Sequence, residues 1–347
     1  MKFGLLGDLH VDIGDKNVRF DFVENVIKEF KQKCLEEDVD FIVILGDLFH
    51  AKVITSTDIL IRVSEIINDL AQDFEDTFIL VGNHDRASYT ETNLSLPNIF
   101  KGNPQIKVFD KLGSAYFNKQ NTTLHFLPYF KDEIIVDTLK NIKKNPGENY
   151  LFGHFGINGF VMQGSKGVDY QSKCSPKHLN GFDQTFLGHY HGYQTKFNVT
   201  YVGSPLQLRH GDEDMPHGFV IFNTTSSLGH EFYKSELPPT YVSMKLNKTN
   251  YEKLLKLKDS YIRIFQTKKL DNKKLISLRD KLLKHNYDVT FVKDYEEKHE
   301  LSVVEGWDEI IKQDAESTFD TFLDKQEKIL KENGWTKKEM LELILTK

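Results

Sequence analysis

The chain has 347 residues and a formal net charge of −6; hydrophobic residues make up 39% of it and charged residues 28%. This composition is typical of a soluble globular protein, and the length predicts one large domain with additions or two to three structural units. With this negative charge the chain lacks the overall basic character of many nucleic-acid-binding proteins. A polyanionic substrate would therefore need a local basic patch, metal ions or a partner.

Short apolar segments of one repeated form run through the first part of the chain. Each is a continuous apolar run followed by Gly and then by Asp, Asn or His: FGLLGD (3–8), FIVILGD (41–47), TFILVGN (77–83), NYLFGH (149–154) and TFLGH (185–189). Uninterrupted apolar runs of this length predict strands that are buried on both faces. A sixth segment, TYVGS (200–204), keeps the form but offers only Ser204.

Helices are expected between the first three of these strands. Apolar residues fall at helical spacing in 20–35 and in 57–72, and Thr57 or Asp58 is a candidate N-cap of the second helix. Alternating strands and helices predict a parallel α/β sheet, whose ligands bind beyond the carboxyl ends of the strands. We therefore expect the five Gly-plus-polar ends to meet at one edge, where glycine lets the chain turn sharply.

The polar side chains at these strand ends are carboxylates, imidazoles and one amide. They are Asp8, His10, Asp47, Asn83, His84, His154, His189 and His191. A mixed set of nitrogen and oxygen donors suits Mn²⁺, Fe²⁺ or Zn²⁺ better than Ca²⁺ or an iron–sulfur cluster, and the set is large enough for two ions. Two metal ions about 3.5–4 Å apart are the usual arrangement for displacement at phosphorus. One such residue after one strand is commonly a cap, but repetition at five strand ends argues against that interpretation.

Two pairs of candidate ligands are each separated by a single residue. They are Asp8 with His10 and His189 with His191. In an extended segment such residues face the same way, so each pair can present two ligands to one cavity while the residue between them points away. Tyr190 should then tolerate Phe or Val far better than either neighbour tolerates Ala.

The motifs resemble those of a known superfamily. Asp8-x-His10, Gly46-Asp47, Gly82-Asn83-His84-Asp85, Gly153-His154 and Gly188-His189-x-His191 stand in the order of the calcineurin-like metallophosphoesterase motifs, over roughly residues 1–225. The longer forms GDLFH (46–50), GNHD (82–85), GHYH (188–191) and YVGSPLQL (201–208) resemble the SbcD-type nuclease subunit of the ATPase–nuclease DNA repair and recombination complex, a type found in bacteria, archaea, eukaryotes and large phages. The resemblance implies a four-layer α/β–β/α sandwich with a small α/β capping domain and a C-terminal helical hairpin.

The resemblance also implies roles for individual residues. One metal ion would be held by Asp8, His10, Asp47 and His191, and the other by Asp47, Asn83, His154 and His189. Mn²⁺ is the ion implied, with Mg²⁺, Fe²⁺ and Zn²⁺ as alternatives. His84 matches the non-ligand histidine that stabilises the transition state or protonates the leaving oxygen, and Asp85 would support its loop by hydrogen bonds. His50 matches a further active-site histidine, although a helix cap is an alternative for it.

Three domains are expected. Residues 1–235 would form the nuclease domain, 236–300 the capping domain and 301–347 a helical segment that binds the ATPase partner. After Pro238-Pro239, strands at 241–246, 260–266 and 287–295 and a helix at 270–286 predict the small α/β module. Its lysines either contact phosphates or form a solvated helix face; they are Lys268, Lys269, Lys273, Lys274, Lys281 and Lys284.

The C-terminal segment carries two predicted helices. One runs from near Trp307 to Glu332, and the other begins at Thr336 with Glu339 completing a capping box. Such a hairpin is too short to be stable alone, so it packs either on a partner or on the capping domain. The resemblance implies that it grips the coiled coil of an SMC-like, SbcC-type ATPase.

The expected function is that of a Mn²⁺-dependent DNA exo- and endonuclease subunit in double-strand-break repair. The resemblance implies a homodimer through helices near 57–72 and 89–100 and DNA as substrate, and no membrane association is expected. The alternatives are a phosphodiesterase for cyclic nucleotides or other small phosphodiesters, and a non-catalytic scaffold.

The chain lacks the GDxxDRG form of protein phosphatases, which weakens that interpretation. It also lacks any GxxxxGK[ST], so ATP hydrolysis would belong to the partner. Two cysteines, Cys34 and Cys174, are too few for a disulfide framework, and with no signal peptide a cytoplasmic location is expected, in the host if the protein is phage-encoded.

Overall fold

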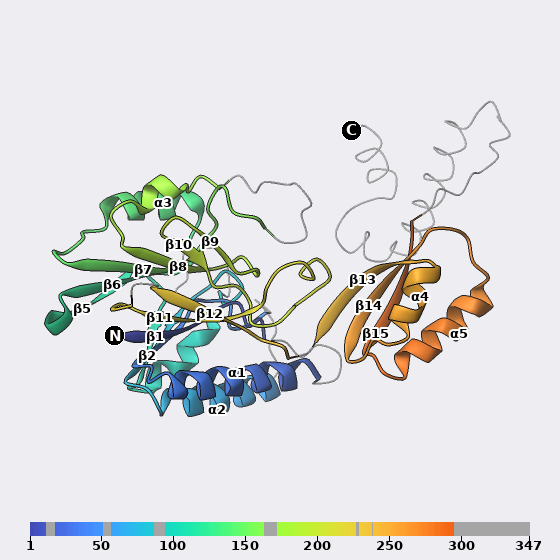
Figure 1. Cartoon of the computed structure of the whole chain (residues 1–347). Helices are drawn as coiled ribbons and strands as arrows, with labels where there is room; N and C mark the ends of the chain where they lie inside the picture. Colours follow the sequence, from blue (N-terminus) through green and yellow to red (C-terminus); the bar gives the residue numbers. More distant parts are fainter. Residues whose placement is uncertain are drawn as a thin grey trace, which may run out of the picture. The chain divides into compact units, whose positions relative to one another are not determined.

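A computed structural model of the chain describes residues 1–11, 18–50, 57–86, 94–162, 172–226, 229–237 and 239–294 (Figure 1). Contacts within the chain divide it into two units, Met1–Tyr295 and Glu296–Lys347. Every element named below belongs to the first unit. The predicted C-terminal hairpin lies outside the described residues.

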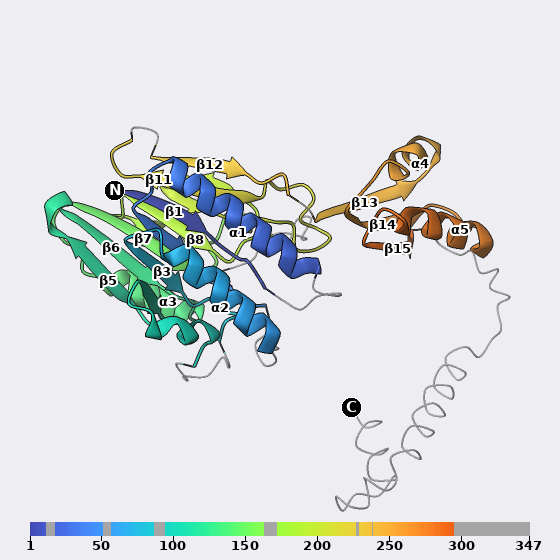
Figure 2. The same ribbon diagram turned by 90° about the horizontal axis from the view of Figure 1, so that it is seen from below.

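The first sheet has six strands in the order β12-β11-β1-β2-β3-β4. Its strands are β1 (Lys2–Leu6), β2 (Phe41–Ile44), β3 (Asp76–Leu80), β4 (Ile106–Phe109), β11 (Gly218–Asn223) and β12 (His230–Lys234). The first four are mutually parallel, and β11 runs antiparallel to β1 and to β12. Helices α1 (Val18–Glu36) and α2 (Thr57–Ala71) lie side by side against this sheet (Figure 2). Both helices were expected from their apolar spacing.

The second sheet also has six strands, in the order β5-β6-β7-β8-β10-β9. Its strands are β5 (Gly113–Phe117), β6 (Thr122–Leu127), β7 (Glu148–His154), β8 (Gln184–Gly188), β9 (Gln194–Lys196) and β10 (Val199–Tyr201). The expectation of a single edge is therefore wrong in one respect, because the five polar strand ends come from two sheets. An apolar run shows that both faces of a strand are buried, but it does not show which sheet the strand joins.

Short helices complete the second half of the domain. Helix α3 (Asp132–Asn141) packs with the 3₁₀ helix Pro176–Leu179 on apolar residues of the second sheet. Two further 3₁₀ helices lie at Leu96–Gly102 and Asn118–Gln120. The first of these overlaps the segment near 89–100 that was expected to contribute to a dimer.

A layer of phenylalanines joins the two sheets. Phe3 of β1 stacks on Phe41 of β2 with ring centroids 5.4 Å apart and approaches Phe152 of β7 at 5.7 Å. A separate apolar cluster lies between α1, α2 and the first sheet, and a third lies between α3 and the second sheet. The order helix, sheet, sheet, helix confirms the expected four-layer sandwich.

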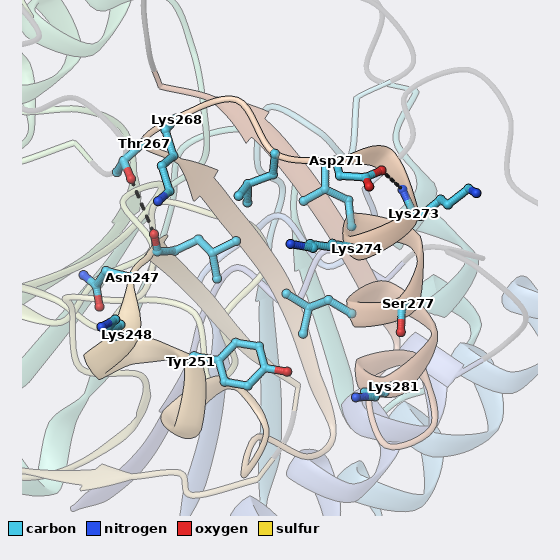
Figure 3. A pocket seen from close by; sticks show the side chains of 14 residues that line it. Asn247, Lys248, Tyr251, Thr267, Lys268, Asp271, Lys273, Lys274, Ser277 and Lys281 are labelled. Carbon is cyan, nitrogen blue, oxygen red and sulfur yellow. Dashed lines mark hydrogen bonds between the residues drawn. The ribbon is translucent and has the colours of Figure 1, made fainter.

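A smaller parallel sheet follows in the chain, with the order β13-β14-β15. It contains β13 (Thr240–Leu246), α4 (Lys248–Leu254), β14 (Ser260–Gln266), α5 (Asn272–Leu283) and β15 (Asp288–Lys293). Its strands had been expected from sequence, but α4 had not. A groove of about 710 Å³ runs between α4 and α5, and Lys274, Lys281 and Tyr251 point into it (Figure 3). The boundaries proposed for the capping domain remain a prediction.

Candidate metal centre

The ends of β1, β2, β3, β7 and β8 meet between the two large sheets. Backbone bonds connect the first two ends, because Asp8 N donates to Gly46 O at 3.2 Å and His10 N donates to Asp47 O at 2.9 Å. The sheets are joined by the amide of His189, which donates to Asp8 Oδ1 at 2.9 Å and to Oδ2 at 3.0 Å. Polar groups that are far apart in the sequence therefore share one partly buried space.

Asp47 lies at the centre of this cluster. Its Oδ2 is 3.3 Å from His154 Nε2 and 3.6 Å from His10 Nε2, while its Oδ1 accepts a hydrogen bond from the amide of His84 at 2.7 Å. His154 Nδ1 donates to Leu45 O at 2.7 Å, which fixes that nitrogen as the protonated one. His154 Nε2 is thereby directed at Asp47, as in a histidine prepared for a metal ion.

The remaining predicted ligands lie on either side of Asp47. Asn83 Oδ1 is 3.0 Å from His189 Nδ1 and 3.2 Å from His154 Nε2. On the other side, ligand atoms of Asp8, His10 and His191 lie within 4.8 Å of one another. The structure thus brings all seven predicted ligands together, and their role in holding ions remains a prediction.

The side chains of four candidate ligands are oriented by a backbone with positive φ angles and not by an extended backbone. The φ angles are 49° at Asp8, 45° at His10, 50° at Asp47 and 94° at His189. The expectation that each i, i+2 pair converges along an extended segment is therefore wrong, although the residue between the members of a pair does point away. Tyr190 is buried and stacks on Tyr201 with centroids 4.5 Å apart.

Two glycines allow the loops to approach this closely. A Cβ at Gly82 would lie 2.1 Å from Asp47 Oδ1, and one at Gly46 would lie 2.5 Å from His154 Nδ1. Gly46 also has a φ of +97°, which side chains rarely adopt. Glycine is thus required at both positions by the spacing of the candidate ligands.

Burial and mutual charge set the protonation of the cluster. Burial would lower the pKa of His154, but Asp47 outweighs it and raises that pKa to about 9. Burial would raise the pKa of Asp47, but His154 and then His10 hold it well below its usual range. Burial, followed by the charge of His154, lowers the pKa of His189 to about 3. Asp47 and His154 therefore stabilise each other's charged forms.

The donors fit divalent metal ions. The set combines carboxylates, imidazoles and an amide oxygen, which suit Mn²⁺, Fe²⁺ and Zn²⁺. His10 Nε2 is buried and has no hydrogen-bond partner among the described residues, which is costly for a polar atom unless an ion binds it. Burial also lowers the pKa of His10 well below its usual value, which keeps its nitrogen free of a proton.

The predicted catalytic residues lie beside the cluster. His84 Nδ1 donates to His50 O at 2.9 Å, and His50 Nδ1 lies 3.3 Å from His10 Nδ1. Asp85 accepts hydrogen bonds from the amides of Phe49 and Gly82, each at 2.9 Å, and so joins the loops after β2 and β3. Burial and then Asp47 raise the pKa of Asp85 to about 7.

One neighbour of the cluster was not singled out from the sequence. Asp212 is fully buried, and its Oδ2 lies 3.7 Å from His191 Nδ1. It occurs in RHGDED (209–214), a polar stretch in which nothing distinguishes it from the acids beside it. The contact with His191 forms only in the folded loop after β10, so the sequence alone does not reveal it.

A family comparison bears directly on this arrangement. The family model for calcineurin-like phosphoesterases matches residues 1–193, which is more than half of the chain. The chain belongs to the calcineurin-like phosphoesterase family. It is accordingly a metal-dependent hydrolase of phosphate esters, and the resemblance found from the motifs is confirmed.

Individual relatives of this phosphoesterase are distant. Exonuclease subunit 1 of Enterobacteria phage T4 is 27% identical over 238 residues, and the match covers 65% of each chain. The phosphoesterase thus spans less than two thirds of that relative. Among solved structures, a dimetal phosphatase from Danio rerio is 13% identical with a TM-score of 0.40, over 64% of this chain and 91% of the other.

The described part of this phosphoesterase contains no helix that is both long and apolar enough to cross a membrane.

Proposed function

We propose that this phosphoesterase is the nuclease subunit of a DNA repair and recombination complex, and that it hydrolyses DNA phosphodiester bonds with two divalent ions, Mn²⁺ in the first place. The observation that carries the proposal is the convergence on one partly buried space of Asp8, His10, Asp47, Asn83, His154, His189 and His191. The similarity to an exonuclease subunit of phage T4 supports DNA as the substrate.

Two bound ions would supply a hydroxide at neutral pH and hold the phosphate oxygens. The side chains of the protein would position the reacting groups and supply the proton. Asp47 bridges the two groups of donors, and its Oδ1 holds the amide of His84 in place. Because Nδ1 of His84 donates to His50 O, Nε2 is left to face the substrate, where it would give a proton to the leaving oxygen.

Replacing His84 by Ala tests the catalytic assignment. We expect about 10²- to 10⁴-fold slower Mn²⁺-dependent hydrolysis of labelled duplex DNA, since that is the usual contribution of an acid–base group. Mn²⁺ binding by His84→Ala should be unchanged, whereas Asp47→Ala should lose both binding and hydrolysis. His285→Ala is the matched control, because His285 is an exposed histidine outside the cluster.

Full activity of His84→Ala or Asp47→Ala would overturn the assignment. Hydrolysis of bis-p-nitrophenyl phosphate without any hydrolysis of DNA would point to a small phosphodiester as substrate.

The groove between α4 and α5 is proposed as a contact for the DNA backbone. Five lysines line it together with Tyr251 and several leucines, and none of the five has an ion-pair partner among the described residues. The lysines are Lys248, Lys268, Lys273, Lys274 and Lys281. Unpaired lysines are suited to phosphates, which release counterions when they are bound.

Replacing Lys274 and Lys281 by Ala should weaken the binding of duplex DNA and flatten its dependence on salt. Each lost phosphate contact reduces the slope of log K against log salt by about 0.9. A salt titration of fluorescent DNA measures this slope, and Lys140→Ala with Lys143→Ala, on and beyond the end of α3, is the matched control. Hydrolysis of bis-p-nitrophenyl phosphate should remain unchanged in both. An unchanged salt slope would assign the lysines to a solvated helix face.

The partner proposed for the segment 301–347 is an SMC-like coiled-coil ATPase, and a homodimer is proposed through α2 and the residues near 89–100. We also propose a cytoplasmic location, in the host cell if the protein is phage-encoded.

A further inference from the structure

We propose that Asp212 is a positioning residue that orients the imidazole of His191 for one of the two metal ions. Asp212 lies in the loop between β10 and β11, and its side chain is fully buried. The proposal rests on the ligand role of His191 given above, and the experiments below separate a failure of one from a failure of the other.

The loop holds Asp212 in a defined place. Asp212 Oδ2 accepts a hydrogen bond from the amide of Leu208 at 2.9 Å, and the ring of His217 lies 2.9 Å from Asp212 O and 3.1 Å from Ser204 O. At the start of the same loop, the amide of Ser204 donates to His191 O at 2.8 Å. One loop therefore holds the backbone of His191 and also places a carboxylate beside its ring.

The surroundings of the carboxylate leave His191 as its main counterpart. Asp212 Oδ2 is 3.7 Å from His191 Nδ1, and Oδ1 has no hydrogen-bond partner among the described residues. Arg209 Nε is 3.9 Å from Oδ1, but the Arg209 side chain is 58% exposed and so is screened by water. A buried carboxylate is costly unless it is paired, and the imidazole of His191, with 14% of its side chain exposed, is the ring that lies beside the carboxylate.

A carboxylate beside Nδ1 has a specific effect on a metal-binding histidine. It favours a proton on Nδ1 that points toward the carboxylate, which fixes the tautomer and the ring plane and leaves the Nε2 lone pair for the ion. Changes to such partners typically weaken metal affinity about 10- to 100-fold. Asp212 would thus control how tightly the ion shared by Asp8, His10 and His191 is held.

The test is Mn²⁺ binding to the full chain carrying Asp212→Asn. Asparagine keeps the shape and can still accept from Leu208 N, but it loses the charge. Calorimetric titration with Mn²⁺ should show one of two sites weakened about 10- to 100-fold and the other unchanged. Electron paramagnetic resonance should show the spin-coupled Mn²⁺ pair replaced by a mononuclear signal. Asp214→Asn, an exposed acid in the same loop, is the matched control and should match the wild type.

A double variant separates positioning from general damage to the loop. If Asp212 acts through His191, Asp212→Asn should add no further loss of Mn²⁺ affinity to His191→Ala. Additive losses, or two unaltered sites in Asp212→Asn, would overturn the positioning role while leaving the metal site intact. If His191→Ala itself binds two Mn²⁺ ions normally, the ligand assignment fails instead.

A measurement on the unmodified chain covers the case in which Asp212→Asn does not fold. Long-range ¹H–¹⁵N spectra of the metal-free protein, labelled in histidine and assigned with His191→Gln, report which ring nitrogen carries the proton. Protonation at Nδ1 is the expected result. Protonation at Nε2 alone contradicts the proposal, because the carboxylate would then face an unprotonated nitrogen.

Discussion

Four residues of the metal centre have backbone conformations that side chains rarely adopt. Asp8, His10 and Asp47 have φ angles between 45° and 50°, and His189 has a φ of 94°. For residues other than glycine, each left-handed conformation costs about 1–2 kcal/mol, and such strain concentrates at functional sites. The packing of the strands on either side must supply that free energy. The sequence showed which residues end the strands, but not this conformation, because Asp and His also occur in ordinary turns.

Tyr190 permits a prediction at the level of one side chain. It is 1% exposed and stacks on Tyr201, so Tyr190→Phe keeps the ring while Tyr190→Val leaves a cavity. We expect the free energy of unfolding to fall by at most about 1.5 kcal/mol for Phe and by about 2–4 kcal/mol for Val. Urea denaturation of the metal-free chain measures both. This refines the sequence expectation, in which Phe and Val were treated alike, and equal stability of the two variants would show that the ring does not fill the core.

At the scale of elements, the apolar runs were the reliable signal. The strands β1, β2, β3, β7 and β8 were all predicted because each is a continuous run ending in glycine and a polar residue. The same ends identified the residues of the cluster, since parallel strands deliver their carboxyl ends to one edge of each sheet, and the contact of His189 with Asp8 joins the two edges. Asp212 escaped detection because it lies in a loop with no such run before it.

Other elements have no clear pattern in the sequence. Strand β5 alternates between half-buried and exposed residues, and α4 buries only Leu254. Neither carries enough apolar residues for a period to be recognised. The division of the strands between two sheets depends on contacts between distant segments, and no local pattern encodes it.

The outer face of α2 permits a prediction about assembly. Ile61 of α2 is 53% exposed and Ile99 of the following 3₁₀ helix is 47% exposed, and both line a shallow groove of about 620 Å³. We expect Ile61→Lys to convert the proposed dimer into monomers, because the charge that replaces the isoleucine would have to be buried in the contact. Sedimentation velocity measures the change. Ile276→Lys, at a 60% exposed isoleucine of α5, is the control and should leave the dimer intact.

At the scale of the whole molecule, the predicted C-terminal helices provide the test of partnership. Removing residues 305–347 should abolish co-purification with the coiled-coil ATPase, because helices this short are not stable alone and we propose that they pack on that partner. Mn²⁺-dependent hydrolysis of bis-p-nitrophenyl phosphate by the shortened chain should persist, since all the candidate ligands lie before residue 192. Pull-down with the full-length chain is the reference. Undiminished binding of the ATPase by the shortened chain would place the contact elsewhere.

The left-handed backbone of the centre has a consequence for how such a protein changes over generations. Glycine, and to a lesser degree asparagine, fits a positive φ better than aspartate or histidine does. Drift under selection for stability alone would therefore favour replacing Asp8, His10 and Asp47, and would remove donors while making the fold more robust. We therefore attribute the costly residues at these positions to the donor atoms that they supply and not to the stability of the fold.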